Sequence, residues 1–218
     1  MSAPPGHANR TRGPLLVHAG MVAPLVLAAG AIAAGLTWPD FRHRTQNLSD
    51  LGGTQAPYPL IMNTAFLTFG LLVIVFAVGL RRIELGRTSP LLVACFGAMM
   101  ALLGVTPCTP GCAEGTGADA AHTLAALTGF LVIIAAMLVS WRRARSDPGS
   151  KRYAVGSAWS ALVVSVFLVG WVVASEVDPE RLLAGVHQRV ATGTVLLWLL
   201  ATAAHVLTRT RNGAHHHA

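Results

Sequence analysis

Six long apolar runs are the feature of this chain that most limits how it can fold. Each approaches the length of about 20 residues that an α-helix needs to cross the hydrocarbon core of a bilayer. Of the 218 residues, 53% are hydrophobic and 11% are charged, and the mean hydropathy is +0.57. Soluble domains do not have such values. The sequence therefore predicts an all-α polytopic membrane protein, a six-helix transmembrane bundle, with spans at residues 14–37, 58–80, 89–106, 120–141, 153–175 and 186–208.

The charged residues are sorted between the two sets of loops that six crossings create. One set holds twelve of the sixteen Lys and Arg residues: Arg10, Arg12, Arg81, Arg82, Arg87, Arg142, Arg143, Arg145, Lys151, Arg152, Arg209 and Arg211. The other set holds seven of the nine acidic residues: Asp40, Asp50, Glu114, Asp119, Glu176, Asp178 and Glu180. Because basic loops stay in the cytoplasm, we expect a multi-pass protein of the cell membrane whose tails, residues 1–13 and 209–218, are cytoplasmic and flank a transmembrane domain at residues 14–208. Basic residues spread over short loops do not indicate nucleic-acid binding.

The first predicted outer loop, residues 39–57, is rich in polar side chains. Coiled as a helix, it would place His43, Gln46, Asn47 and Asp50 on one face and apolar side chains on the opposite face. We expect such a helix to lie along the membrane interface.

The second predicted outer loop contains Cys108 and Cys112 with a Pro-Gly pair between them. A turn there favours a local disulfide on the oxidising side of the membrane, and the alternative is a zinc site completed by a histidine. Asp119 and His122 follow three residues apart and can meet on one helical face, and Asp119 is also placed to cap that helix. Cys95, in the third apolar run, is expected to be a small buried side chain.

The last predicted outer loop leads into His187, Gln188 and Arg189. A guanidinium about one turn inside the membrane boundary seeks a carboxylate or a lipid phosphate, or extends to the headgroups. Asn63 lies at a similar predicted depth in the second run. These positions predict a small recessed polar site.

Several of these segments also resemble a known family. The run Gln46–Gly52, the Pro- and Cys-containing loop before His122, and the pair Gln188–Arg189 are similar to the bacterial and archaeal multi-pass family catalogued as domain of unknown function 998. The resemblance implies a compact helical bundle and assigns no activity. Ser49, Asp50 and His122 match family positions, whereas a histidine at position 187 is not expected throughout the family.

Two functional hypotheses follow. In the first, the outer polar site binds a membrane lipid or a membrane-protein partner without turnover, and the protein is a lipid-handling or accessory component. In the second, it is a metal-dependent hydrolase of a lipid or lipid-linked substrate, with zinc as the candidate cofactor held by His43, His122 and His187. The candidate catalytic residues are Ser49, Asp50, Asp119 and His122, and the candidate substrate-binding residues are Asn47, Asn63, Gln188 and Arg189. In a metal-free variant of the hydrolase, His122 is the base and Asp119 orients it. The histidines at positions 215–217 are left out, because a terminal histidine run binds metal adventitiously.

Overall fold

A computed structural model of the protein describes residues 13–83, 87–176 and 182–215 as an all-α structure. Of the charged residues assigned above to the two sets of loops, Arg10, Arg12, Asp178 and Glu180 lie outside these ranges. The described chain contains six long helices and three short 3₁₀ turns. In order they are α2 (Ala19–Leu36), η1 (Leu48–Gly52), α3 (Pro59–Arg82), α4 (Thr88–Leu103), η2 (Pro110–Cys112), α5 (Gly117–Ala144), η3 (Pro148–Ser150), α6 (Lys151–Glu176) and α7 (Ala184–His215).

Five of the described helices are long and apolar enough to cross a membrane, and α4, with 16 residues, is shorter. The six predicted spans therefore correspond to six helices, five of which meet the length expected of a spanning helix. Large apolar side chains such as Leu25, Leu71, Leu131 and Leu197 face outward, each more than half exposed. In water such a surface is unfavourable, whereas lipid solvates it. The protein is a multi-pass integral membrane protein.

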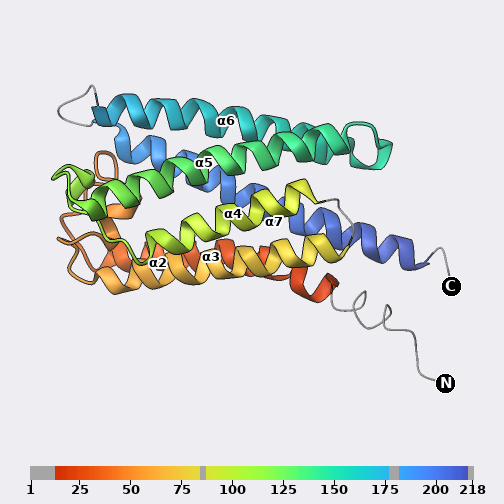
Figure 1. Ribbon diagram of the computed structural model, residues 1–218, viewed down its shortest axis with the longest axis horizontal. Helices are drawn as coiled ribbons and strands as arrows, with labels where there is room; N and C mark the ends of the chain where they lie inside the picture. Colours follow the sequence, from red (N-terminus) through yellow and green to blue (C-terminus); the bar gives the residue numbers. More distant parts are fainter. Residues whose placement is uncertain (1–12, 84–86, 177–181, 216–218) are drawn as a thin grey trace, which may run out of the picture.

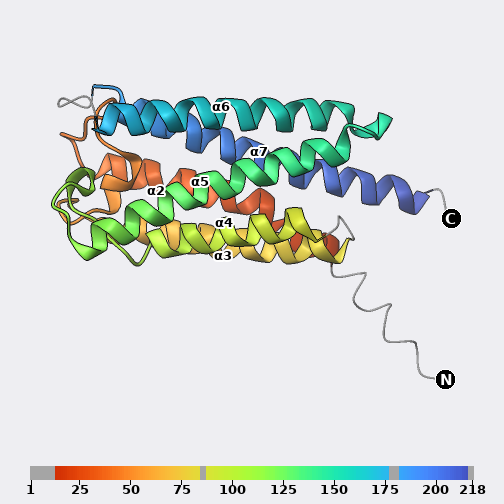
Figure 2. The ribbon, with the colours of Figure 1, turned by 45° about the horizontal axis from the view of Figure 1, so that its top comes forward.

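The helices form a closed ring in chain order. Each helix packs against the next, and α2 also packs against α7. Figures 1 and 2 show the six helices running roughly along one long axis, with successive helices in opposite directions. The centre of the ring is filled by apolar side chains, among them Phe69, Phe76, Met62, Ile133 and Leu199.

The alternating directions separate the loops into two groups. The loops at residues 37–58 and 104–116 lie at one end of the bundle, with the start of α7 (Figure 1). We call this the disulfide end. The turn η3, the end of α3 and the C-terminal part of α7 lie at the other end, which we call the Asp147 end. Helix α7 continues to His215, past the boundary at residue 208 that the sequence predicted.

Small residues let neighbouring helices approach closely. A Cβ added at Gly30 would lie 2.3 Å from the Cβ of Ala65 on α3. At the α3–α4 contact, a Cβ on Gly97 would lie 2.7 Å from the carbonyl oxygen of Gly70, and one on Gly70 would lie 2.4 Å from that of Gly97. Backbone-to-backbone contact of this kind excludes any side chain.

The prediction for Cys95 is wrong. Its side chain is exposed on the outer surface of α4, because the inward-facing positions of this helix are occupied by Val93, Phe96, Gly97 and Met100. A thiol facing lipid is compatible with the membrane environment, since cysteine behaves as a small apolar residue.

At the Asp147 end, one carboxylate connects the α5–α6 turn to α7. Asp147 accepts hydrogen bonds from Arg209, from the Ser150 hydroxyl at 2.9 Å and from the Gly149 amide at 3.0 Å. These bonds, the one from Arg209 first, lower the pKa of the Asp147 carboxyl below its ordinary value of 3.8.

We expect Gly97→Ala to lower stability by about 1–3 kcal/mol, because the added methyl pushes α3 and α4 apart. The matched control is Gly193→Ala in α7, where an added Cβ meets nothing within 4 Å. The measurement is the temperature at which half of the detergent-solubilised protein stays monodisperse. Equal thermal stability of the two variants would contradict the close contact.

The Asp147 interactions predict a pH dependence of stability. Because the pKa of Asp147 is lower when folded, its contribution is present above pH 3.8 and is lost as the pH falls through the folded-state pKa. Asp147→Asn is therefore less stable than the native protein at neutral pH, and the difference in melting temperature narrows as the pH falls below 3.8. Glu114→Gln, at the other end of the bundle, serves as the control. A difference for Asp147→Asn that stays constant over this range would refute the assignment.

Candidate polar cavity at the disulfide end

The first loop folds into the bundle instead of lying along the interface, so the prediction of an interfacial helix is wrong. Its segment 38–47 forms turns, and only η1 is helical. Asn47, Ser49, Asp50 and Leu51 are all buried. The reason is local: the Asp50 carboxylate accepts the backbone N–H of Asn47 at 2.7 Å, which closes a tight turn instead of extending a helix.

The second loop contains a disulfide between Cys108 and Cys112. The Cys112 amide donates to the Thr109 carbonyl at 2.7 Å across Pro110 and Gly111, the Pro-Gly turn expected from the sequence. Gly111 has φ +62° and Cys112 has φ +53°. A left-handed conformation is strained for a residue with a side chain, and here the cross-link and the hydrogen bond hold it in place.

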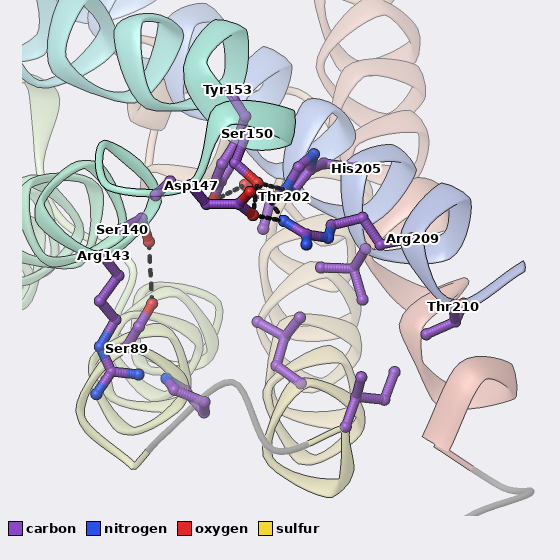
Figure 3. Close-up of a pocket in the computed structure, with 15 residues that line it drawn as sticks. Ser89, Ser140, Arg143, Asp147, Ser150, Tyr153, Thr202, His205, Arg209 and Thr210 are labelled. Carbon is purple, nitrogen blue, oxygen red and sulfur yellow. Dashed lines mark hydrogen bonds and ion pairs between the residues drawn. The ribbon is translucent and has the colours of Figure 1, made fainter. Parts of the chain in front are cut away.

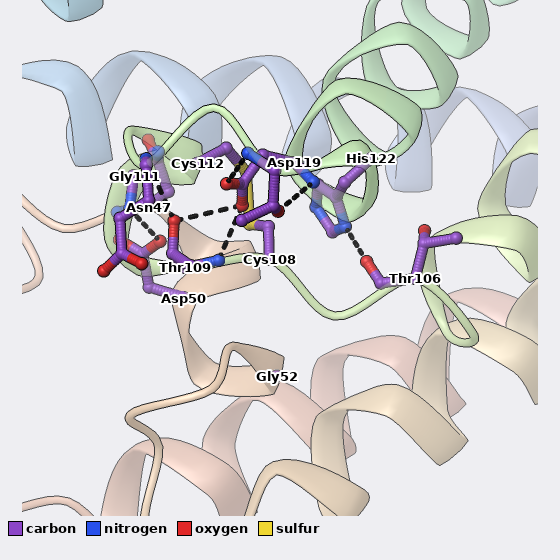
Figure 4. Close-up of a disulfide and its surroundings, with 12 residues drawn as sticks. Asn47, Asp50, Gly52, Thr106, Cys108, Thr109, Gly111, Cys112, Asp119 and His122 are labelled. Atoms are coloured by element: carbon purple, nitrogen blue, oxygen red, sulfur yellow. Dashed lines mark hydrogen bonds between the residues drawn. A yellow bond between two sulfur atoms is a disulfide. The ribbon is translucent and has the colours of Figure 1, made fainter.

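Two aspartates attach these loops to each other and to α5 (Figure 4). Asp50 accepts the Gly111 amide at 3.1 Å, which joins the first loop to the disulfide loop. Asp119, 2% exposed, accepts the amide and hydroxyl of Thr109 at 2.8 and 3.0 Å and the Thr116 amide at 3.0 Å. The Thr54 amide adds a bond to the Cys108 carbonyl at 3.0 Å. Both candidate catalytic carboxylates therefore accept hydrogen bonds from loop amides.

Arg189 fastens the first loop to α7. Its guanidinium donates to the carbonyl oxygens of His43, Gln46 and Gly185 at 2.8, 2.9 and 2.9 Å. The structure thus gives Arg189 three backbone acceptors, and its binding of a carboxylate or a lipid phosphate stays a prediction.

The remaining candidate binding residues join the same loop to the helices. Gln188 accepts the Leu48 amide, and Asn47 accepts the indole N–H of Trp171 at 2.9 Å. Asn63 donates to the Gly52 carbonyl at 3.0 Å and packs so closely that a Cβ on Gly52 would lie 2.2 Å from its Oδ1. Asn63 is therefore occupied by a loop contact, whereas Asn47 and Gln188 also line the cavity described below.

The three histidines proposed as zinc ligands are not brought together. His43 lies against Phe41, and its Nδ1 is 3.4 Å from Arg189. The His187 Nδ1 is 2.8 Å from the Leu183 carbonyl, and its ring packs against Phe167. Among the described residues, the one group of three that could share an ion is Cys108, Cys112 and His122, with ligand atoms within 4.8 Å of one another. Its two sulfurs form the disulfide and would become ligands only after reduction.

The two ring nitrogens of His122 differ: one faces a carbonyl, and the other has no partner in the described part of the chain. Its Nδ1 lies 2.7 Å from the Thr106 carbonyl oxygen, which only accepts hydrogen bonds. In the neutral ring, Nδ1 therefore carries the hydrogen and Nε2 presents a lone pair. His122 is 4% exposed, and its Nε2 is buried with no hydrogen-bond partner among the described residues.

A cavity of about 370 Å³ adjoins this histidine. Ser175, at the end of α6, also lines it, and the buried Ser175 Oγ likewise has no partner among the described residues. The described lining residues are uncharged: Asn47, Ser49, Gly111, Cys112, Ala113, His122, Thr123, Ala126, Leu127, Trp171, Val172, Ser175 and Gln188. An apolar groove of about 290 Å³ between α5 and α6 shares Leu127 and Val172 with this cavity. The cavity thus has a polar part and an apolar extension.

Sequence reasoning missed Trp171 and Ser175. They lie four residues apart near the end of α6, so they share one face of that helix. A tryptophan close to the end of a membrane-spanning run was the available signal. It indicates depth in the membrane and not which way the side chain points.

Comparison with known proteins gives one match. No curated protein and no solved structure matches the chain. The family described as Protein of unknown function (DUF998) matches over residues 21–205, which covers α2 through most of α7 and every residue of the polar cavity. The chain belongs to the DUF998 family.

Proposed function

We propose that this membrane protein binds a neutral amphiphile that carries a hydroxyl group, with the polar group in the cavity at the disulfide end and the tail in the groove between α5 and α6. The observation that carries the proposal is a pair of polar atoms without partners among the described residues, His122 Nε2 and Ser175 Oγ, on two residues that line one cavity. A buried polar atom without a hydrogen bond costs about 1–3 kcal/mol. A ligand that satisfies both atoms recovers that cost.

The chemistry of the two atoms selects the ligand class. The His122 Nε2 lone pair accepts a hydrogen bond, and the Ser175 hydroxyl donates or accepts one. A ligand hydroxyl complements them by donating to Nε2 and accepting from Oγ. The described lining residues carry no charge that would balance an ionic headgroup, and burying an unbalanced charge costs more than burying a hydroxyl.

The groove supports the tail assignment. Its lining is entirely apolar: Leu127, Leu131, Leu168, Val169, Val172 and Val173. Leu131 and Val169 are more than 60% exposed, so the groove faces the lipid around the bundle. A lipid chain lying there stays in contact with the bilayer while its polar end enters the cavity. Membrane lipids are thus the proposed source of the ligand.

The zinc hydrolase is the weaker candidate. It needs three ligands converging on one ion, and His43, His122 and His187 make separate contacts. It also needs a carboxylate directed at the substrate, whereas Asp50 and Asp119 bind loop amides. Binding without turnover requires neither feature.

We also propose that the disulfide end faces the outside of the cell membrane. The support is the positive-inside rule, because most basic side chains belong to segments that lie at the Asp147 end. A disulfide in a loop at this end agrees with an oxidising compartment on that side.

Binding is tested with two photoactivatable C16 probes, a long-chain alcohol and the matched fatty acid, on protein in neutral detergent. We expect the alcohol to cross-link to peptides of α5 and α6 and the fatty acid to do so weakly. Ser175→Ala removes one ligand contact and no contact within the described protein, so it should weaken alcohol binding by about two- to tenfold at unchanged stability. His122→Asn retains a donor toward the Thr106 carbonyl, loses the Nε2 acceptor, and should have a similar effect.

The control is His187→Asn, which changes a histidine at the same end outside this cavity. The proposal fails if the fatty acid binds as well as the alcohol, or if Ser175→Ala and His122→Asn bind the alcohol as the native protein does.

Orientation is tested separately by cysteine labelling in a Cys95→Ala background. Gln55 is exposed at the disulfide end and Ser146 at the Asp147 end. In intact cells, a membrane-impermeant maleimide should label Gln55→Cys and reach Ser146→Cys only after the membrane is permeabilised. The opposite pattern would reverse the proposed orientation and leave the ligand proposal untouched.

A further inference from the structure

Three side chains of the second loop and α5 meet at the disulfide (Figure 4). A sulfur of Cys108, a sulfur of Cys112 and a ring nitrogen of His122 lie within 4.8 Å of one another. In a tetrahedral zinc site such ligand atoms are about 3.5–3.8 Å apart, because zinc binds sulfur at about 2.3 Å and nitrogen at about 2.0–2.1 Å. A small movement of these side chains would therefore give the spacing of a metal site.

His122 already has the hydrogen bonding of a metal-binding histidine. Its Nδ1 lies 2.7 Å from the Thr106 carbonyl oxygen, and the second ring nitrogen of a metal-bound histidine is commonly held by such an acceptor. Its Nε2 is buried and has no hydrogen-bond partner in the described chain. His205, at the Asp147 end, differs because its Nε2 lies 3.2 Å from the Ser150 hydroxyl (Figure 3). A buried imidazole nitrogen without a partner, next to two sulfurs, indicates a metal ligand.

Hydrogen bonds hold the cysteine loop independently of the cross-link. Asp119 accepts the amide and the hydroxyl of Thr109 at 2.8 and 3.0 Å. The Cys108 carbonyl accepts the Thr54 amide at 3.0 Å. Because none of these bonds involves a sulfur, breaking the disulfide leaves the loop, and with it both sulfurs, close to His122.

We infer that reduction of the disulfide converts this group into a binding site for Zn²⁺, with the thiolates of Cys108 and Cys112 and the Nε2 of His122 as ligands. Two thiolates and a neutral imidazole make a neutral complex with a divalent ion, and a net charge would be costly to bury in an apolar bundle. Sulfur and nitrogen ligands favour zinc over magnesium and calcium, which bind oxygen. Cys112 and His122 both line the polar cavity, and a water from this cavity supplies the fourth ligand.

The reductant is a dithiol, and thiol–disulfide exchange balances the reaction. Cys112 is half-buried and lines the cavity, whereas Cys108 is buried. A thiolate of the dithiol therefore bonds to the Cys112 sulfur, and Cys108 leaves as a thiolate. The second thiol of the dithiol then closes the dithiol's own disulfide and releases Cys112. Two electrons pass from the dithiol to the protein, and its two protons pass to the cysteines and are released when Zn²⁺ binds.

This metal site does not depend on the proposed amphiphile site, although the two share the Nε2 of His122. The amphiphile is proposed for the oxidised protein and the ion for the reduced protein. An ion on Nε2 takes the lone pair that would accept a ligand hydroxyl, so the two exclude each other. The zinc hydrolase considered above required His43 and His187, and neither belongs to this group.

Zinc binding is measured on the full chain in neutral detergent, in a Cys95→Ala background with the histidines at positions 215–217 replaced by alanine. These changes remove the remaining thiol and the terminal histidine run. The protein is reduced with a water-soluble phosphine and desalted without oxygen, or left oxidised, and is then titrated with Zn²⁺ against a chromophoric chelator. We expect about one Zn²⁺ per reduced chain and binding to the oxidised chain that is weaker by about tenfold or more. Equal titrations of the two forms overturn the inference.

Variants and a spectroscopic probe distinguish this site from adventitious binding. His122→Asn retains a donor toward the Thr106 carbonyl but lacks Nε2, and it should weaken Zn²⁺ binding to the reduced chain by about tenfold or more. His187→Asn changes a histidine at the same end outside the group and should stay within about twofold. Co²⁺ should show a thiolate-to-metal charge-transfer absorption with the reduced chain and none with the oxidised chain.

Equal affinity of His122→Asn and His187→Asn for Zn²⁺, or absence of the thiolate absorption with Co²⁺, rules the site out. The amphiphile cross-linking described above uses oxidised, metal-free protein. Failure of that experiment and failure of this one are therefore distinguishable.

Discussion

The structure at the disulfide end depends on one constraint: backbone polar groups that enter an apolar bundle need hydrogen-bond partners. Loop residues 47–54 and 106–112 are not helical enough to satisfy their own amides and carbonyls. Three charged side chains provide hydrogen-bond partners for these loop amides and carbonyls. Asp50 and Asp119 accept loop amides, and Arg189 donates to three loop carbonyls. Charged side chains are suited to this role, because hydrogen bonds to ions are about twice as strong as those between neutral groups.

This use of the charges explains why the cavity beside them is neutral. Asp50, Asp119 and Arg189 lie close to the cavity in the chain but bind backbone groups. Within the part of the chain that the structure describes, His122 Nε2 and Ser175 Oγ are then the buried side-chain atoms without a hydrogen-bond partner. The disulfide contributes by holding Gly111 and Cys112 in left-handed conformations, so that the Gly111 amide reaches Asp50. The polarity of the cavity follows from how its loops are fastened.

Much of the fold could be predicted from the sequence, because apolar run lengths and charge sorting depend on bulk transfer free energies. The Pro-Gly turn and the cysteine pairing were also local enough to infer. The candidate site was less predictable. His122, Asn47, Ser49 and Gln188 all line the cavity, but His43 and His187 do not join His122, because sharing a membrane end says nothing about lateral position around a ring of helices. The burial of the first loop was missed because its periodicity is amphipathic, whereas one side-chain bond from Asp50 to the Asn47 amide decides its conformation.

The two ends of the bundle use the same charged residue types in different ways. At the Asp147 end, Asp147 pairs with Arg209 and the Ser150 hydroxyl bonds to both, so a carboxylate and a guanidinium compensate each other. At the disulfide end, the carboxylates and the guanidinium form hydrogen bonds with backbone groups. Hydroxyl and imidazole groups remain as the polar groups of the cavity. The same residue types thus pair with each other at one end and with backbone groups at the other. Because a buried charge without compensation is costly, the buried polar atoms that stay without a partner among the described residues belong to a neutral imidazole and a hydroxyl, those of His122 and Ser175.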